Sequence, residues 1–352
     1  MIIDVTGFGW SGSGAYIDLL REYNNVQFPN NDPEWECYLL HWVDGVKDLE
    51  YKLMEKNCRV YDADIAVRRF LKAAKRYSTQ RGYEPFEGQF YNMCMNYVDS
   101  LEGKKFILKT ASDRIYFNNR ELLCFCYNKL IDLFFCNNLT KSMFNRRLVD
   151  KLQISRIHSK RIIYHPANFY DATHSFISTF FSFLKKNGTM PIVTNHLFSP
   201  DCPHLFFNLV GEDVRCIVVR RDPRDTFLLA KKLRAEGISA VPSENVDDFI
   251  WFYKKTIQET KINHPKVLCL NFEDLIYNYD RTVAEVESFT GVKEHVTPKK
   301  YFNPSISINN TQLFKNISSS HIEIAKIEHE LRDSLFDFSQ YNNRPDFSTK
   351  LF

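Results

Sequence analysis

The chain of 352 residues is long enough for about two domains of ordinary size, or for one α/β domain with a large insertion. Its content of 44% hydrophobic and 25% charged residues is typical of a globular protein and excludes a disordered or fibrous one. Lys and Arg exceed Asp and Glu by only three, 46 against 43, so no overall basic charge favours nucleic acid as a partner. Any anion site must therefore come from a local cluster of basic residues.

The cysteines and the apolar runs predict where the protein resides. Nine cysteines, none of them in a CxxC pair, indicate reduced thiols in a chain too long to need disulfide bonds. Asp4 interrupts the first apolar run, where a secretory signal needs an unbroken one. No stretch approaches the ~18 apolar residues that a membrane span requires. We expect a cytoplasmic protein without a transmembrane segment.

The first predicted element is a buried parallel strand over the apolar residues 2–6. The strand leads through GFGWSGSG, residues 7–14, into a stretch that predicts a helix from Gly14 to Tyr23. A strand that runs directly into a helix is typical of α/β folds. The N-terminal stretch therefore favours an α/β protein.

The rest of the chain divides into a helical stretch and a second α/β stretch. Residues 45–185 have helical periodicity and predict a helical insertion or subdomain within a single domain that spans residues 1–352. Further strands are expected at 190–196, 214–221 and 266–275, and helices at 224–235, 246–260, 280–290 and 319–335. The sequence thus predicts a P-loop-like three-layer α/β fold with a mostly parallel central sheet flanked by helices.

The glycine spacing of residues 7–12 fits two nucleotide motifs. A dinucleotide site needs an acidic residue about 20 positions further on; Asp32 lies near that distance but among turn residues. The P-loop of a kinase or ATPase needs Lys and then Ser or Thr after the last glycine, where this chain has Ser13 and Gly14. A third interpretation is a nest of main-chain N–H groups and hydroxyls at a helix N-terminus, which binds an anion without a metal.

A second basic cluster lies at the end of a later predicted strand. The stretch CIVVRRDPRDTFLLAKK, residues 216–232, places Arg220, Arg221 and Arg224 where that strand ends and a helix begins. Some of these charges can pair with the neighbouring aspartates. Open α/β sheets nevertheless bind ligands at the carboxyl ends of their strands. The sequence therefore predicts a second anion site at the same edge of the sheet.

These two motifs, in this order, resemble those of the sulfotransferases that use 3′-phosphoadenylyl sulfate (PAPS). GFGWSGSG at 7–14 is similar to the family's loop for the 5′-phosphosulfate, and RDPRD at 221–225 to its motif for the 3′-phosphate. LNFEDL at 270–275 resembles the strand and helix that follow, and residues 301–315 resemble the segment that closes over the nucleotide in bacterial polysaccharide-type members. The resemblance leaves about 45–185 unmatched.

The resemblance implies which residues bind the donor nucleotide. They are Trp10, Ser11, Gly12, Ser13, Gly14, Ala15, Arg221 and Lys315. Ser11 to Gly14 would cradle the 5′-phosphosulfate, and Arg221 would hold the 3′-phosphate. PAPS would be a co-substrate, released as adenosine 3′,5′-bisphosphate, and the resemblance implies no metal.

The resemblance leaves two candidates for the catalytic base. VTNHLF at 193–198 is similar to a segment that carries the catalytic histidine in the cytosolic branch of the family, so His196 is the first candidate. Carbohydrate-modifying branches use a glutamate closer to the loop, which makes Glu36 the competing candidate, with Glu34 and His41 as weaker neighbours.

Two positions depart from the family's pattern. Trp10 stands where the family usually has Lys or Arg, a cation that stabilises charge on the leaving phosphate oxygen. The serine that usually follows in the arginine motif is Leu229 here. Lys231, Lys315 or a residue of the helical insertion could replace the lost cation.

The expected function is transfer of a sulfuryl group from PAPS to a hydroxyl or amine. We expect a carbohydrate or cell-surface glycan as acceptor, bound by residues 45–185, and no nucleic-acid partner. Two alternatives remain open: a P-loop kinase-like phosphotransferase, which would need magnesium, and a non-catalytic nucleotide-binding protein, which Trp10 favours. The sequence does not define the oligomeric state.

Overall fold

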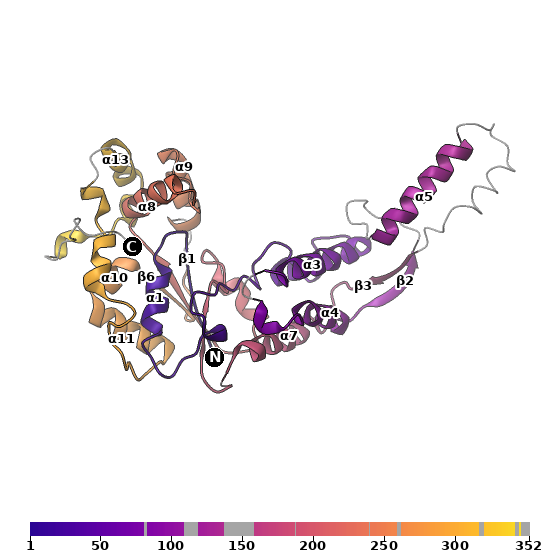
Figure 1. Cartoon of the computed structure of the whole chain (residues 1–352), viewed down its shortest axis with the longest axis horizontal. Helices are drawn as coiled ribbons and strands as arrows, with labels where there is room; N and C mark the ends of the chain where they lie inside the picture. Colours follow the sequence, from indigo (N-terminus) through magenta and orange to yellow (C-terminus); the bar gives the residue numbers. More distant parts are fainter. Residues whose placement is uncertain are drawn as a thin grey trace. The chain divides into compact units, whose positions relative to one another are not determined.

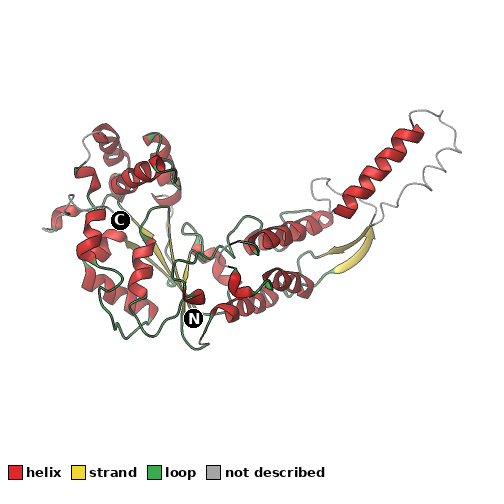
Figure 2. Cartoon of the chain, viewed as in Figure 1, coloured by secondary structure: helices red, strands yellow, loops and turns green. Residues whose placement is uncertain are grey.

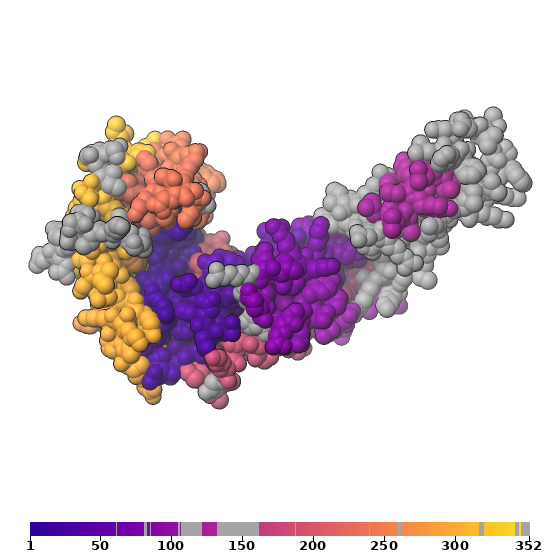
Figure 3. All heavy atoms as spheres, viewed as in Figure 1, coloured from indigo at the N-terminus to yellow at the C-terminus, as the bar shows by residue number. Residues whose placement is uncertain are grey.

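The computed structural model describes residues 1–80, 83–108, 119–136, 158–186, 188–238, 240–258, 262–316, 320–341 and 345. The remaining residues are grey in Figures 1 to 3. The chain forms two compact units, one of residues 1–42, 81–87 and 173–352 and the other of residues 43–80 and 88–172.

The first unit is built on a four-stranded sheet in which all strands are parallel (Figure 1). Its strands are β1 (Ile2–Gly7), β4 (Ile192–Asn195), β5 (Val214–Arg220) and β6 (Val267–Asn271), in the order β4-β1-β5-β6. The register places Asp4 opposite Thr194 on one side and Cys216 on the other. The carboxyl ends of the strands therefore lie at one edge, and the loop after β1 lies between the ends of β4 and β5.

Helices flank this sheet, so the predicted α/β class is confirmed (Figure 2). They are α1 (Ser13–Leu20), α8 (Pro223–Ala235), α9 (Val246–Tyr253), α10 (Phe272–Tyr277), α11 (Tyr279–Thr290), α12 (Pro304–Ser307) and α13 (His321–Glu330). Helix α7 (Phe169–Leu184) crosses the division between the two units. The strand expected at 266–275 is shorter than predicted, because Asn271 and Asp274 form a capping box that starts α10.

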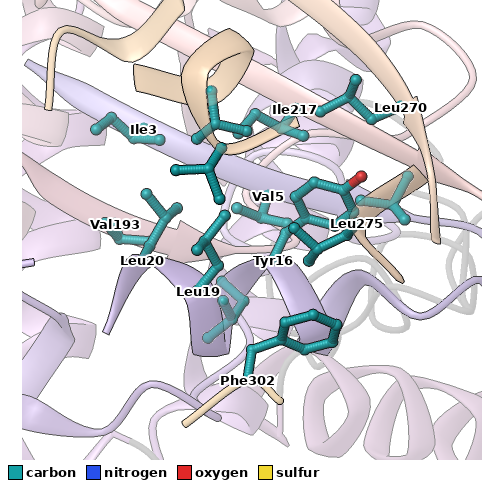
Figure 4. Packing of buried hydrophobic residues seen from close by; sticks show 14 of the residues in the cluster. Ile3, Val5, Tyr16, Leu19, Leu20, Val193, Ile217, Leu270, Leu275 and Phe302 are labelled. Carbon is teal, nitrogen blue, oxygen red and sulfur yellow. The ribbon is translucent and has the colours of Figure 1, made fainter. Parts of the chain in front are cut away.

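One face of the sheet packs against α1, α10 and α11 in a hydrophobic core (Figure 4). Ile3 and Val5 are fully buried on this face, and because strand residues alternate, Asp4 and Thr6 lie on the opposite face. The core joins residues far apart in the sequence, such as Leu20 and Leu275. On the surface, indigo atoms of the N-terminal part adjoin yellow-orange atoms of a much later part of the chain (Figure 3). This packing fixes α1, and with it the glycine-rich loop, against the end of β1.

The second unit is mainly helical in its described part. Its elements are α2 (Val46–Leu53), α3 (Ala63–Tyr77), α4 (Phe90–Ser100), α5 (Asn119–Cys136) and the antiparallel strands β2 (Lys104–Leu108) and β3 (His158–Ile162). The helical periodicity of 45–185 did not predict the strand pair, since each strand has only five residues and its partner lies far along the chain. Within the described ranges of the whole chain, no helix has both the length and the apolar character that a bilayer crossing requires.

Candidate functional site

The loop between β1 and α1 has left-handed backbone angles and a close contact with Phe272 that requires glycine at residue 12. Trp10 and Gly12 both have left-handed backbone angles, with φ of 65° and 81°. A Cβ on Gly12 would lie 2.6 Å from the ring of Phe272, so only glycine fits without rearrangement. The main-chain N–H of Ser11 donates to the oxygen of Phe8 at 2.9 Å, which closes the turn. The loop is thus fixed by its own main-chain hydrogen bond and by packing against Phe272 at the start of α10.

Two buried polar groups of this loop have no hydrogen-bond partner among the described residues. They are the hydroxyl of Ser11 and the indole N–H of Trp10. The Ser11 hydroxyl lies where a Cβ on Gly7 would be, so Gly7 makes room for it. Buried polar groups are nearly always hydrogen-bonded, so these two groups before the helix N-terminus are donors that a bound molecule could satisfy.

The first turn of α1 supplies a further opening beside these groups. A Cβ on Gly14 would meet nothing within 4 Å, so the space next to this residue is open. The N–H of Ala15 is already used, because it donates to the oxygen of Gly12 at 3.0 Å. The first N–H groups of an α-helix have no intrahelical acceptor, so those of Ser13 and Gly14 remain for an anion.

Arg221 follows β5 and lies beside the loop, although it is far from the loop in sequence. Its Nη1 donates to the main-chain oxygen of Trp10 at 3.3 Å, its Nη2 donates to the main-chain oxygen of Asn310, and its guanidinium lies 4.9 Å from the centre of the Phe272 ring. An arginine has five N–H donors, so further N–H groups of Arg221 remain after these two hydrogen bonds. Its buried Nε–H has no partner within the described part of the chain, and neither has the side-chain oxygen of Asn310.

Buried carboxylates surround the RDPRD motif. Asp225 accepts hydrogen bonds from the main-chain N–H groups of Gln312 and Leu313 at 2.7 and 2.8 Å, which fixes residues 308–315, here named the strap. Glu273 accepts one from the N–H of Asp222 at 3.0 Å. Burial raises the pKa of Asp225 to about 7 and that of Glu273 to about 8. Proton uptake by these carboxyls is therefore easier in the folded chain than in the unfolded one.

Three other cations singled out from the sequence have partners elsewhere in the first unit. Arg224 pairs with Asp222 at 2.7 Å and with Glu328 at 2.9 Å. Lys231 pairs with Glu323 at 2.7 Å. The exposed Lys315 lies on the strap and donates to the side chain of Gln312 at 2.5 Å. Arg224 and Lys231 thus each form an ion pair with α13, and Arg224 forms a second one with the N-cap residue of its own helix.

The two candidate bases are neighbours at the end of β4. The N–H of Cys37 donates to the oxygen of Asn195 at 2.7 Å, which aligns the segment around Glu36 with the edge of the sheet. The Tyr38 hydroxyl donates to the Glu36 carboxylate, and the Tyr38 ring stacks on that of His196 at 6.3 Å. Burial lowers the pKa of His196 more than the charge of Glu36 raises it. His196 is therefore neutral near pH 7, as a general base must be.

Several residues of this site were not found from the sequence. Phe272 lies inside the strand predicted at 266–275 and follows the observed strand β6, so its place at the carboxyl edge of the sheet became clear only from the structure. Tyr38 lies near Glu36 in the chain, but nothing in the sequence pairs it with His196. Asn310 contacts Arg221 through its main chain, which carries no residue-type signal.

A pocket of about 370 Å³ lies in the second unit. It is lined by Asp44, Asp48, Leu49, Tyr51, Lys52, Cys58, Asp62, Ile65, Ala66 and Arg69. Arg69 and Asp44 form an ion pair of 2.6 Å within this lining. The mixture of charged, aromatic and aliphatic side chains suits a ligand that carries several polar groups.

Comparisons with known proteins found similar solved structures only. No protein-family model matches the chain, and no curated protein matches it in sequence. Similar structures include a sulfotransferase domain from a Synechococcus olefin synthase (9% identity, 96% of this chain, 95% of that chain, TM-score 0.41). Another is a sulfotransferase domain of the curacin biosynthetic pathway, with 11% identity over 95% of this chain and 98% of that chain and a TM-score of 0.40. A third is retinol dehydratase in complex with androsterone and the inactive cofactor PAP, with 12% identity over 97% of this chain and 82% of that chain and a TM-score of 0.33.

Proposed function

We propose that this chain is a sulfotransferase that uses PAPS as donor. The observation that carries the proposal is the contact between the glycine-rich loop and Arg221, through the Trp10 oxygen at 3.3 Å. This contact joins two anion-binding elements at one edge of the sheet. PAPS has phosphate groups at both the 5′ and the 3′ position, as such a paired site requires, and the sequence motifs resemble those of PAPS enzymes.

The unpaired donors define how the nucleotide would be held. The Ser11 hydroxyl and the first N–H groups of α1, at Ser13 and Gly14, would bind the 5′-phosphosulfate. The Nε–H of Arg221 would bind the 3′-phosphate while its terminal nitrogens keep their bonds to the loop and the strap. Lys315, on the strap, is proposed as a further cation of the nucleotide site.

The site would promote sulfuryl transfer by holding donor and acceptor in line and by accepting the acceptor's proton. When bound, PAPS supplies a sulfuryl group attached to a phosphate that leaves readily. The acceptor oxygen forms a bond to sulfur as the bond between sulfur and the phosphate oxygen breaks, and the acceptor proton passes to His196 or Glu36. The charge on the departing phosphate would be stabilised by the helix N-terminus and by the indole N–H of Trp10, which stands where the family has a cation.

We propose a carbohydrate hydroxyl as acceptor, bound by the second unit. Support comes from the pocket around Tyr51, because aromatic rings stack on sugars and charged side chains hydrogen-bond to hydroxyls. Tyr51→Ala and Asp48→Asn should raise the KM for the acceptor and leave the affinity for adenosine 3′,5′-bisphosphate unchanged. Equal KM values in wild type and variants would remove the pocket from the proposal.

Calorimetry with adenosine 3′,5′-bisphosphate, with and without magnesium, tests the donor. We expect binding in both conditions, and weaker binding of adenosine 5′-monophosphate, which lacks the 3′-phosphate. No binding refutes the proposal, and binding only with magnesium favours a kinase-like phosphotransferase. Transfer of radiolabelled sulfate from PAPS to a panel of glycans, phenols and alcohols then tests turnover. His196→Gln and Glu36→Gln should both bind the nucleotide, and only the variant of the true base should lose turnover.

A non-catalytic nucleotide-binding protein is the second candidate. The observation that favours it is Trp10, since an indole N–H carries no positive charge to stabilise the leaving phosphate. This candidate predicts tight binding of adenosine 3′,5′-bisphosphate without transfer to any acceptor of the panel.

A further inference from the structure

Thr6 connects His196 to the turn that follows β4. Thr6 is fully buried near the end of β1, and its hydroxyl donates to the main-chain oxygen of Phe198 at 2.9 Å. The same hydroxyl oxygen lies 3.1 Å from Nδ1 of His196. One hydroxyl therefore contacts both the turn and the imidazole ring.

These two contacts determine which ring nitrogen carries the proton. A hydroxyl has a single proton, and a carbonyl oxygen can only accept, so the proton of Thr6 is committed to Phe198. The contact with His196 must then run from an N–H on Nδ1 to the Thr6 oxygen. A neutral imidazole has only one N–H, which leaves Nε2 with an unprotonated lone pair.

The turn that holds the Phe198 oxygen is fixed by the buried carboxylate of Asp4. Asp4 accepts hydrogen bonds from the N–H groups of Leu197 and Phe198, at 2.9 and 3.1 Å, and from the Thr194 hydroxyl at 2.8 Å. His196 itself has a left-handed backbone with φ of 56°. Since non-glycine residues rarely adopt this conformation, the turn must hold it in place.

We propose that Thr6 is a positioning residue that sets the tautomer of His196, so that Nε2 is the atom that accepts the acceptor proton. The catalytic part of this statement rests on the proposed sulfuryl transfer, whereas the tautomer does not. Glu36, Tyr38 and His41 also lie around the His196 ring, and the hydrogen-bond contact at Nδ1 is the one with the Thr6 hydroxyl. In this proposal the base is His196, and Glu36 is a charged neighbour of its ring.

The tautomer is measured directly by NMR of the full chain with ¹⁵N-labelled histidine, without any ligand. The signals of His196 are identified by their loss in His196→Gln. At a pH where the ring is neutral, we expect Nδ1 to be protonated and Nε2 to be unprotonated in the wild type. A wild-type ring protonated on Nε2 overturns the proposal, whether or not the Thr6 variants fold.

Three variants test the role of Thr6. Thr6→Val keeps the shape and removes the hydroxyl, and should convert His196 to a mixture of tautomers, whereas Thr6→Ser should restore the Nδ1–H form. Thr194→Val is the matched control, because it removes an equally buried hydroxyl bound to Asp4 without touching the ring. An unchanged His196 spectrum in Thr6→Val, or the same change in Thr194→Val, contradicts the proposal.

Kinetics supply a separate readout. Thr6→Val should lower kcat by about 10-fold to 100-fold, a part of the ~10²–10⁴-fold that general-base catalysis contributes, with the KM for the acceptor and the affinity for adenosine 3′,5′-bisphosphate unchanged. Failure of the wild type to transfer sulfate refutes the proposed function and leaves the NMR result to stand by itself. A normal kcat in Thr6→Val with an altered tautomer refutes the catalytic part alone.

Discussion

The Nη1 of Arg221 donates a hydrogen bond to the main-chain oxygen of Trp10 at 3.3 Å, and so joins the end of β5 to the loop after β1. Its Nη2 holds the main-chain oxygen of Asn310 on the strap. Arg221 therefore has two tasks: it assembles the loop and the strap, and it presents a buried N–H that has no partner among the described residues. Changes at this residue should affect stability as well as binding.

Arg221→Ala should lower the affinity for adenosine 3′,5′-bisphosphate by roughly 10-fold to 100-fold, since one hydrogen bond to a charged group contributes ~1.5–3 kcal/mol. Calorimetry measures the affinity, and urea unfolding measures the stability lost with the two carbonyl contacts. The control is Arg215→Ala, at the opposite end of the same strand, where Arg215 pairs with Asp213 at 2.8 Å. Equal loss of affinity in both variants would contradict the assignment.

Gly12→Ala and Gly14→Ala should have opposite effects on stability. A side chain at residue 12 would meet the Phe272 ring and a left-handed backbone, so we expect a loss of about 1–3 kcal/mol in the free energy of unfolding. Gly14 lies in α1 beside open space, so alanine there should stabilise the helix by up to about 1 kcal/mol. Urea unfolding measures both.

The Gly14→Ala variant also distinguishes an effect on stability from an effect on nucleotide binding. If the space beside Gly14 belongs to the nucleotide, Gly14→Ala should weaken adenosine 3′,5′-bisphosphate binding while raising stability. Unchanged affinity in this variant would place the 5′-phosphosulfate elsewhere.

Glu273→Gln should remove part of the pH dependence of stability. Burial raises the pKa of Glu273 to about 8 from its ordinary value of 4.5, so between these pH values the folded state binds a proton that the unfolded state has released. The free energy of unfolding contributed by this group therefore falls as pH rises through that window, by at most ~1.4 kcal/mol per pH unit. Urea unfolding from pH 5 to pH 8 should show a shallower decline in the variant. An identical slope in wild type and variant would refute the shift.

Trp10→Lys should raise kcat by roughly 10-fold or more, because a cation stabilises the leaving phosphate better than a neutral N–H does. Trp10→Phe removes the N–H and should lower kcat. Both variants place a non-glycine side chain on the same left-handed backbone, so they are matched for strain. Initial rates at saturating PAPS provide the measurement, and equal rates in the two variants would exclude residue 10 from leaving-group stabilisation.

Much of the first unit could be predicted from local patterns. Buried parallel strands appear as continuous apolar runs, so β1, β4 and β5 were recognisable in the sequence. Glycines mark tight loops, and a strand that ends in arginines marks the carboxyl edge of the sheet, so the sequence could indicate both the loop and Arg221, which contact each other in the structure; their binding of an anion stays a prediction. The end of β6 was misplaced because the capping box at Asn271 uses residues that also fit a polar turn.

Other parts depend on contacts between distant segments and have no local signal. The bond from Arg221 to Asn310 uses a main-chain oxygen, which any residue would supply. Glu36 lies near His196 because the N–H of Cys37 pairs with the oxygen of Asn195 at the end of β4. The role of Thr6 follows only from the direction of its hydroxyl bond to Phe198. Such features require the folded chain.

The attachment of the strap to Asp225 also determines when the site exists during synthesis. Asp225 accepts the N–H groups of Gln312 and Leu313, and Arg221 holds Asn310, so segments from both ends of the chain build one site. A ribosome-bound nascent chain that stops short of Asn310 contains the glycine-rich loop, Arg221 and Asp225 but lacks the strap. If the chain binds the nucleotide as proposed, capture has to wait until the strap has been synthesised, and donor affinity then reports that the strap has docked on Asp225 and Arg221.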